Sequence, residues 1–299
     1  MAGAMQKPHE FLASGDVLGG CTLLQVVGKG SMGAVYRAWQ SKLSRQVAVK
    51  VLMKARFDQL VTAERFLQEA ETVANLRHPN IMSVYDSGER EDCVFFVMEY
   101  LEGPSLADWI KRKAKHPLAF RRRASLAEVK EVANATLSAL EHAHAQGIVH
   151  RDIKPENLLW SGGSAGLVVT DFGLAAVNYV TFEAEKLFIL GSPLYVSPEQ
   201  ARGDEVDGRA DLFSLGCVLL EIVLGQLPVR VERPEKLFRA RAKEDPGMFT
   251  GTPKALRPDL PDEWDRFLQK ALAPSLSRRF SSATEMRTAL EGLSVQEKR

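Results

Sequence analysis

A lysine in the middle of an apolar strand places the strongest constraint on the fold of this chain. Residues 47–52 read VAVKVL, a run of β-forming residues in which Lys50 carries the single charge. An unpaired ammonium group costs several kcal/mol when it is buried, so Lys50 requires a carboxylate partner. The apolar residues of 62–77 recur at helical spacing, and Glu69 lies within their stripe. We therefore expect a strand and a helix joined by a Lys50–Glu69 ion pair, although Glu69 alone would read as a surface residue at a helix edge.

A glycine-rich string precedes this strand. Residues 28–35 read GKGSMGAV and fit G-x-G-x-x-G-x-V, a pattern whose glycines let the backbone approach phosphate groups closely. In dinucleotide-binding folds such a string joins a strand to a helix. Here the residues that follow, 34–39 and 46–52, are rich in β-formers and favour a hairpin between strands. By itself the string is equally compatible with a plain structural hairpin.

Two polar strings further along carry the candidate chemistry. They are HRDIKPEN, which begins at His150, and DFG, which begins at Asp171. Asp152 can align and deprotonate a hydroxyl group, and the cation of Lys154 can neutralise oxygens in transit. Asn157 and Asp171 supply hard oxygen ligands for Mg²⁺. This spacing of charges suits the transfer of a phosphoryl group, in which positioning and electrostatic stabilisation do most of the catalysis.

With further strings in the same order, the chain resembles the protein kinase superfamily from about Cys21 to Leu293. The strings SPEQARG and HAQGIVHRDIKPEN are most similar to bacterial serine/threonine kinases of the eukaryotic (Hanks) type. The additional matching strings are LRHPNI (76–81), VMEYLEG (97–103), GSPLYVSPEQARG (191–203) and DLFSLGCVLLEIVLGQLP (211–228). Their joint occurrence in this order is highly specific.

The resemblance implies an α+β, bilobal protein kinase fold. It comprises a small N-lobe with an antiparallel sheet and one helix, a larger and mainly helical C-lobe, and an ATP cleft between them. We expect an N-terminal tail over 1–19, a kinase domain over 20–293 and a C-terminal tail over 294–299. Within the domain, the N-lobe would span about 20–101 and the C-lobe about 102–293.

The resemblance also implies ATP as the phosphoryl donor and Mg²⁺ as the metal, for which Mn²⁺ could substitute. Asn157 and Asp171 would be the metal ligands. The implied catalytic residues are Lys50, Glu69, Asp152, Lys154, Asn157 and Asp171. The implied ATP-binding residues are Val27, Gly28, Lys29, Gly30, Ser31, Met32, Gly33, Ala34, Val35, Ala48, Lys50, Met98, Glu99, Leu101 and Leu159.

Three supporting roles follow from the same resemblance. Asp211 matches the residue that holds the backbone of the catalytic loop in kinases. Glu199 is expected to pair with Arg279, although the Asp-Pro that usually precedes such an arginine is missing here. His142 and His144 lie on a predicted helix, and we interpret them as surface or packing residues.

Composition limits the classes of partner. The apolar share of 45% excludes a disordered chain, and the net charge of +1 provides no global field for nucleic acid. The longest apolar run, 212–225, is too short to cross a bilayer and contains Glu221, so we expect a buried central helix and no membrane span. Three cysteines without metal-ligand spacing favour a reducing, cytoplasmic location. The expected partners are proteins with Ser or Thr acceptors, and the oligomeric state is left open.

The segment 111–125, KRKAKHPLAFRRRAS, is longer and more basic than its counterparts in the family. A solvated loop is the simpler interpretation, and a docking patch is the alternative. Three arginines stand just before Ser125, a pattern favoured by kinases that modify basic sequences. Ser125 and Glu128 also form the S-x-x-E pattern of a helix capping box. A cap and a phosphorylated Ser125 are compatible, because phosphate is tolerated at a helix N-terminus.

Arg151 precedes Asp152, an arrangement in which a phosphate often activates kinases by pairing with the arginine. Between DFG and GSP, Thr181 is a candidate acceptor, and Glu183 and Glu185 stand near where bacterial relatives carry phosphothreonines. A carboxylate could partly replace the phosphate. We therefore expect basal activity without modification, with Thr181 as the alternative switch.

Three classes of function fit these strings: an active serine/threonine kinase, a pseudokinase that binds without turnover, and a kinase-like domain acting on a small molecule. Pseudokinases usually lose the equivalents of Lys50, Asp152 or Asp171, and all three are present. Small-molecule kinases of this fold generally lack a full GSPLYVSPE segment. The active protein kinase is therefore the leading hypothesis.

Overall fold

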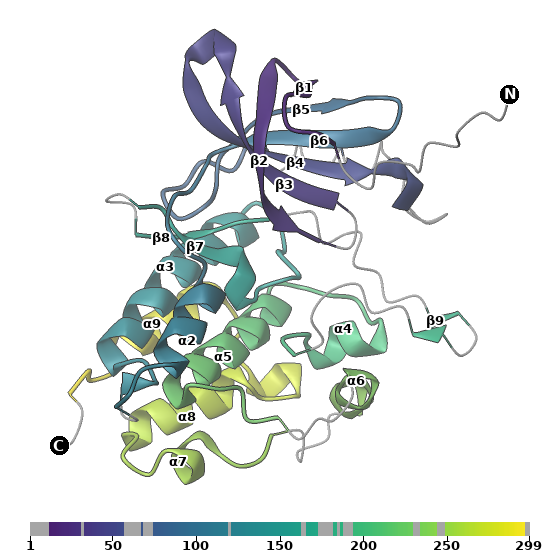
Figure 1. The fold of residues 1–299 in the computed structure, drawn as a ribbon. Helices are drawn as coiled ribbons and strands as arrows, with labels where there is room; N and C mark the ends of the chain where they lie inside the picture. The colour runs from purple at the N-terminus through teal and green to yellow at the C-terminus, as the bar shows by residue number, and fades with distance from the viewer. Residues whose placement is uncertain are drawn as a thin grey trace, which may run out of the picture. The chain divides into compact units, whose positions relative to one another are not determined.

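The chain divides into two compact units, Met1–Arg77 with Ser83–Leu101 and His78–Met82 with Glu102–Arg299. The computed structural model, shown in Figure 1, describes residues 12–30, 33–56, 67, 74–118, 121–162, 166–172, 182–183, 186–187, 194–229, 234–243 and 249–296.

The first unit contains one antiparallel sheet of six strands in the order β1-β2-β3-β4-β6-β5 (Figure 1). Strand bounds are β1 Val17–Leu18, β2 Cys21–Lys29, β3 Gly33–Gln40, β4 Arg45–Met53, β5 Val84–Glu89 and β6 Cys93–Met98, with 3₁₀ turns η1 Ser41–Leu43 and η2 Lys54–Arg56. Strand β6 reads CVFFVM and is buried along its whole length, because β4 and β5 flank it on both edges. The expected antiparallel sheet is confirmed.

The glycine-rich string forms the predicted hairpin between β2 and β3. Gly30 donates its N–H to the carbonyl oxygen of Gly33 at 2.9 Å. A Cβ atom at Gly33 would collide with the backbone oxygen of Val51 on β4, so only glycine fits this position. Ser31 and Met32 lie outside the described residues.

The helix expected over 62–77 falls largely outside the described residues, which include Leu67 and the stretch from Ala74 onward. Glu69, the expected partner of Lys50, is among those not described. The Lys50–Glu69 ion pair therefore stays a prediction.

The second unit is mainly helical. Its helices are α2 Leu106–Ala114, α3 Leu126–His144, α4 Pro198–Arg202, α5 Arg209–Leu224, α6 Pro234–Ala242, α7 Pro253–Leu256, α8 Asp262–Ala271 and α9 Ala283–Glu291. The described part of this unit also contains two short antiparallel strand pairs, β7 Leu158–Trp160 with β8 Leu167–Val169 and β9 Phe182–Glu183 with β10 Lys186–Leu187. It further contains the 3₁₀ turns η4 Pro155–Asn157 and η7 Leu276–Arg278.

Helices α3 and α5 form the core of this unit, where α5 packs against α3 and α8, and α3 packs against α9 (Figure 1). The capping box predicted for α3 is present, because Ser125 accepts a hydrogen bond from the N–H of Glu128 while the Glu128 carboxylate accepts one from the N–H of Ser125. Helix α5 is buried nearly all round, as its apolar sequence predicts. Among the described residues, no helix has the length and apolar character needed to cross a bilayer.

Candidate active site

A buried carboxylate on α5 holds the loop at 150–157. Asp211 is fully buried, and its two oxygens accept hydrogen bonds from the backbone N–H groups of His150 at 2.8 Å and Arg151 at 2.7 Å. Arg151 has a left-handed φ of 65°, a strained conformation that these bonds help to maintain. The role expected for Asp211 is therefore present in the structure.

His144, in the last turn of α3, adds a third contact to Asp211, with Nε2 2.8 Å from Oδ2. Its interpretation as a surface or packing residue was incomplete, because the ring supports the carboxylate that positions the loop. Sequence alone offers little signal for this contact, since the two residues stand 67 positions apart.

His150 is buried in a single tautomer. Its Nδ1 accepts a hydrogen bond from the N–H of Asp152 at 3.2 Å, and its Nε2 lies 2.8 Å from the carbonyl oxygen of Thr170. These contacts assign the ring hydrogen to Nε2. The edge of the ring meets Phe172 at a centroid distance of 4.5 Å. His150 thus ties the segment before Asp171 to the segment that carries Asp152.

Asp152 lies at the centre of a polar cluster. Lys154 Nζ is 2.6 Å from Asp152 Oδ2, and Asn157 Nδ2 donates to the same oxygen at 3.0 Å and to the Asp152 carbonyl oxygen at 2.8 Å. Because both side-chain donors engage Oδ2, Oδ1 is the oxygen that could accept a proton from a substrate hydroxyl. The side chains of Asp152 and Lys154 are 20% and 18% exposed, so a substrate can reach them.

A backbone hydrogen bond connects the segments that carry Asn157 and Asp171, the expected metal ligands. The N–H of Thr170 donates to the Asn157 carbonyl oxygen at 2.9 Å, and Asp171 follows with a left-handed φ of 62°. Since Asn157 Nδ2 is committed to Asp152, its Oδ1 is the side-chain atom that could bind a metal ion. An amide and a carboxylate oxygen fit Mg²⁺. The described part of the chain has no group of three or more His, Cys, Asp or Glu that could hold a metal, so this pair would need ligands such as phosphate oxygens.

The sheet unit contains the residues expected around the nucleotide. Lys50, on β4, is half-buried and pairs with Val35 on β3 and Phe96 on β6. Ala48 and Met98 are direct neighbours across β4 and β6, and both are buried. The register therefore places Ala48 and Met98, candidate adenine residues, two pairs along the strands from the candidate phosphate-binding lysine.

In the segment after β6, one backbone N–H group is already used in a hydrogen bond within the sheet unit. Glu99 donates its N–H to the carbonyl oxygen of Ser83 at 2.9 Å, so its carbonyl is the group that could bind an adenine edge. Leu101 follows and is buried. Leu159 belongs to the helical unit, where it is half-buried on β7.

Two buried arginines fix the backbone around the start of α4. Arg279 forms two hydrogen bonds to the Glu199 carboxylate, at 2.7 and 3.2 Å, and both side chains are almost fully buried. Arg279 also donates to the carbonyl oxygens of Ala273, Pro274 and Arg209 at 2.8–3.0 Å. The predicted Glu199–Arg279 pair is confirmed.

The second arginine, Arg241 on α6, was not identified from the sequence. It is fully buried, and Nη2 donates to the carbonyl oxygen of Leu194 at 2.6 Å. Both Nη atoms lie 3.6 Å from Cys217 Sγ, and the guanidinium carbon is 4.8 Å from the centroid of the Phe213 ring. Among the described residues no carboxylate pairs with Arg241, and its Nε has no hydrogen-bond partner.

Tyr195 adds a third anchor to the same segment. Its hydroxyl donates to Glu221 Oε2 at 2.6 Å, and its carbonyl oxygen accepts from Ser214 Oγ at 2.8 Å. Burial raises the pKa of Glu221 above its usual value; the Tyr195 hydrogen bond opposes this shift and the negative charge of Glu156 adds to it. Burial and the charge of Glu221 likewise raise the pKa of Tyr195.

Part of the predicted regulatory region lies outside the described residues, including Thr181 and Glu185. Glu183 is on β9, but its side chain is likewise not described. The proposed carboxylate substitute for an activating phosphate therefore stays a prediction.

Comparisons with known proteins identify the family to which the chain is similar. A family model described as "Protein kinase domain" matches residues 21–290. The chain is 36% identical over 284 residues to serine/threonine-protein kinase PrkC of Bacillus subtilis, covering 93% of this chain and 41% of that protein. It is 37% identical over 275 residues to serine/threonine-protein kinase PknB of Mycobacterium tuberculosis, covering 89% and 41%.

Among solved structures, a crystal structure of the M. tuberculosis PknI kinase domain matches with a TM-score of 0.73 and 29% identity, over 94% of this chain and 98% of that one. The fold is thus that of a protein kinase domain. The chain belongs to the protein kinase domain family. It spans about two fifths of the length of the curated relatives that it matches.

Proposed function

We propose that this chain is an ATP- and Mg²⁺-dependent serine/threonine protein kinase. It transfers the γ-phosphoryl group of ATP to Ser or Thr hydroxyls of protein substrates, and it phosphorylates itself. The observation that carries this proposal is the hydrogen-bonded cluster of Asp152, Lys154 and Asn157. The names of the bacterial relatives support the Ser/Thr preference. We assign the kinase domain to residues 20–293, with tails on either side.

In the proposed reaction the hydroxyl oxygen of the substrate forms a bond to the γ-phosphorus. The bond from that phosphorus to the bridging oxygen of ADP breaks, and the hydroxyl proton passes to Asp152 Oδ1. Lys154 donates to Asp152 Oδ2, a position in which its positive charge offsets that of the phosphoryl oxygens. Asn157 Nδ2 donates to the same carboxylate oxygen and to the Asp152 carbonyl oxygen. These two bonds keep the base oriented before a substrate arrives.

Asn157 Oδ1 and the Asp171 carboxylate would hold Mg²⁺, or Mn²⁺ in its place. The bound metal would neutralise phosphate charge and orient the group that is transferred. The geometry supports this role because the amide hydrogens of Asn157 are committed to Asp152, which turns its oxygen into the available ligand.

The sheet unit would bind the rest of ATP. Val35 and Ala48 would contact the adenine, Lys50 would bind the α- and β-phosphates, and Glu69 would hold Lys50 in place. The burial of Ala48 and the register of Val35 opposite Lys50 support these roles. The hairpin that contains Val27 to Ala34 would cover the phosphates.

We place the chain in the cytoplasm with proteins as its partners. All three cysteines are free and buried, which supports a reducing compartment. The near-neutral net charge supports a protein ligand rather than a nucleic acid.

Incubation of the purified protein with radiolabelled ATP and Mg²⁺, followed by mapping of phosphorylated residues, tests the activity. Asp152→Asn should keep nucleotide affinity, measured by calorimetry, and lower kcat by about 10²–10⁴, the usual contribution of a positioned base. Asp204→Asn, which neutralises an exposed carboxylate, is the matched control and should leave kcat unchanged. Turnover of the Asp152 variant within about threefold of wild type would refute the assigned base.

A further inference from the structure

Two helices of the second unit begin with the same kind of capping box but complete it with different residues. At α3 the box consists of Ser125 and Glu128, and at α4 it consists of Ser197 and Gln200. In each box the longer side chain accepts a hydrogen bond from the backbone N–H of the serine. Glutamate and glutamine both serve in such a box, so the cap itself does not explain why α4 has a glutamine.

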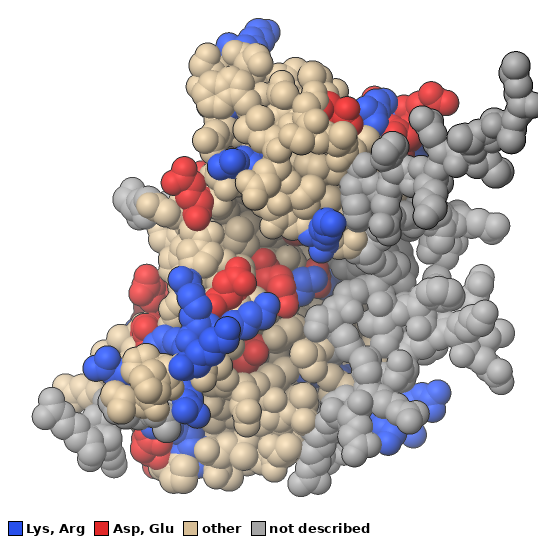
Figure 2. All heavy atoms as spheres, viewed as in Figure 1, with Lys and Arg blue, Asp and Glu red and all other residues tan. Residues whose placement is uncertain are grey.

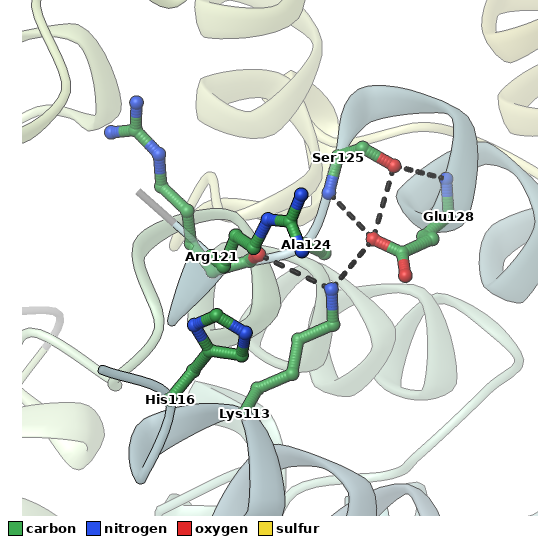
Figure 3. Close-up of a pocket in the computed structure, with 7 residues that line it drawn as sticks. Lys113, His116, Arg121, Ala124, Ser125 and Glu128 are labelled. Carbon is green, nitrogen blue, oxygen red and sulfur yellow. Dashed lines mark hydrogen bonds and ion pairs between the residues drawn. The ribbon is translucent and has the colours of Figure 1, made fainter. Parts of the chain in front are cut away.

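The surroundings of Glu128 explain the carboxylate at α3. Lys and Arg side chains gather over helix α2 (Figure 2). One of them, Lys113, extends toward the start of α3, where its Nζ lies 2.8 Å from Glu128 Oε2 (Figure 3). Burial alone would raise the pKa of Glu128, but the bonds from Lys113 and Ser125 outweigh burial and lower it. A negative charge is therefore stabilised in this box.

The glutamine at α4 faces a carbonyl group instead. Gln200 Nε2 donates to the Arg151 carbonyl oxygen at 2.8 Å, while Gln200 Oε1 accepts from the N–H and the Oγ of Ser197 at 3.2 and 3.1 Å. A flipped amide would place Oε1 against a carbonyl oxygen and the NH₂ group against an N–H donor, so these partners fix its orientation. A carboxylate at this position could cap α4 but could not donate to Arg151.

The bond to Arg151 acts on the peptide unit that precedes the candidate base. The Arg151 carbonyl and the Asp152 N–H belong to one planar unit and point in opposite directions. Gln200 donates to the carbonyl, and His150 Nδ1 accepts from the N–H at 3.2 Å. Bonds on both sides oppose rotation of this unit, which is attached to the Cα atom of Asp152. The amide of Gln200 therefore helps to set the direction of the Asp152 side chain.

This peptide unit needs support because the residue that begins it is strained. Arg151 has a left-handed φ of 65°, a conformation that residues other than glycine seldom adopt. Asp211 on α5 accepts from its N–H at 2.7 Å, and Gln200 on α4 donates to its carbonyl oxygen. Side chains from two helices thus bind both backbone polar groups of the strained residue.

Gln200 is itself held on a fixed support. Ser197, which binds its Oε1, is fully buried. Glu199, the residue before Gln200, is buried and paired with Arg279 at 2.7 Å. Since the start of α4 is anchored in this way, the amide of Gln200 approaches Arg151 from a fixed direction.

We propose that Gln200 is a positioning residue for the transfer reaction. Its amide holds the peptide unit between Arg151 and Asp152, and thereby keeps the base in the orientation that accepts the hydroxyl proton. The catalytic consequence rests on the proposed function, whereas the hydrogen-bonded geometry does not. Because Gln200 acts through Asp152 and not on the nucleotide, its loss should lower turnover and leave nucleotide affinity unchanged.

Gln200→Glu separates the two bonds of this side chain. The change keeps an oxygen for the cap and replaces the donor by an oxygen that repels the Arg151 carbonyl. The assay uses radiolabelled ATP, Mg²⁺ and myelin basic protein as a general Ser/Thr acceptor. At about pH 8 we expect kcat to fall at least about tenfold, with the KM for ATP within about twofold of wild type. As pH falls toward about 5.5, protonation of the introduced carboxyl supplies an O–H donor, so the ratio of variant to wild-type kcat should rise.

Two further variants control for the cap and for the added charge. Gln200→Met removes the cap and the donor together, so its kcat should stay at a constant ratio to wild type over the same pH range. Gln296→Glu adds the same charge at an exposed position and should leave kcat within about twofold of wild type at every pH. Urea unfolding of each variant confirms that it is folded at the assay temperature.

Turnover of Gln200→Glu within about threefold of wild type at about pH 8 would overturn the proposal. A loss that does not shrink as pH falls would also overturn it, because the cap or the packing would then set the effect. A wild-type protein that transfers no label would instead refute the proposed function. The backbone amide NMR signal of Asp152 then decides the positioning role: Gln200→Glu should shift it and Gln296→Glu should not, and a signal unmoved in both variants would overturn the role.

Discussion

Helix α5 fixes two stretches of backbone by opposite electrostatic means. Asp211, a buried anion, accepts from the N–H groups of the loop at 150–157. Two residues further on, the Phe213 ring lies against the buried cations Arg241 and Arg279, at 4.8 and 4.9 Å, and these donate to backbone carbonyl groups. An anion thus holds the loop of the candidate base, and cations hold the segment around α4.

The two arginines also differ from each other. Arg279 faces the carboxylate of Glu199, whereas Arg241 contacts a carbonyl oxygen, a thiol and aromatic rings. The cost of removing a buried charge depends mainly on the partner that is left behind. Loss of Arg279 leaves the buried Glu199 carboxylate without its partner, whereas the described partners that Arg241 would leave behind are all neutral. Similar burial should therefore give unequal effects.

We expect the largest effect from Asp211→Ala. The change leaves two backbone N–H groups and His144 without their acceptor, at roughly 1–3 kcal/mol each, so we expect a loss of about 4–6 kcal/mol in unfolding free energy. Urea unfolding measures this loss. Asp211→Asn keeps an acceptor oxygen and should lose about half as much; an equal loss in both variants would show that charge, rather than acceptor count, holds the loop.

Arg279→Met should be next, with a loss of about 3–5 kcal/mol, because Glu199 is then buried without its partner. Adding Glu199→Gln to this variant should recover part of the loss, since no carboxylate is left uncompensated. The double-mutant cycle, followed by urea unfolding, gives the coupling between the two residues. Additive losses would mean that the pair itself contributes nothing beyond its separate contacts.

Arg241→Met should cost only about 1–2 kcal/mol, the penalty for leaving the Leu194 carbonyl without a donor. The substitution keeps an apolar stem against Phe213. If the loss equals that of Arg279→Met, the comparison between the two arginines fails, and burial rather than the stranded partner sets the cost. The same unfolding assay answers the question.

The smallest effect concerns the pH dependence of stability at the other end of α5. Because burial raises the pKa of Glu221 above its ordinary value of 4.5, the folded state holds this proton to higher pH than the unfolded state does. The resulting stability is fully present below pH 4.5 and is lost as pH rises through the folded pKa. Glu221→Gln should reduce this loss of unfolding free energy with rising pH. Tyr195→Phe removes the hydrogen bond that lowers the pKa of Glu221, so the loss should continue to higher pH. Unfolding free energies measured from about pH 5 to pH 8 check both variants.

The sequence predicted those parts of the molecule whose causes are local. The capping box of Ser125 and Glu128, the buried α5 and the requirement for glycine at position 33 all follow from patterns within a few residues. The Glu199–Arg279 pair was also predicted, because the family resemblance supplied a partner 80 residues away.

The contacts that sequence analysis missed join distant segments without a recognisable pattern. Arg241 and Leu194 stand 47 residues apart, and the acceptor is a backbone carbonyl that every residue possesses. Tyr195 and Glu221 are ordinary residues in their own segments, and only the packing of α5 brings them together. Such contacts depend on tertiary geometry, which periodicity and propensity do not encode.

Each compact unit contains at least one buried thiol whose rate of alkylation can report on the opening of that unit. Cys21 and Cys93 lie in the sheet unit and Cys217 in the helical unit, and burial raises the pKa of all three, that of Cys93 to about 11. Alkylating reagents attack the thiolate, so these cysteines should react only when their surroundings open. Timed exposure to iodoacetamide, read peptide by peptide, would therefore report the opening of the two units separately in one unlabelled sample, and would reveal which of them a nucleotide makes more rigid.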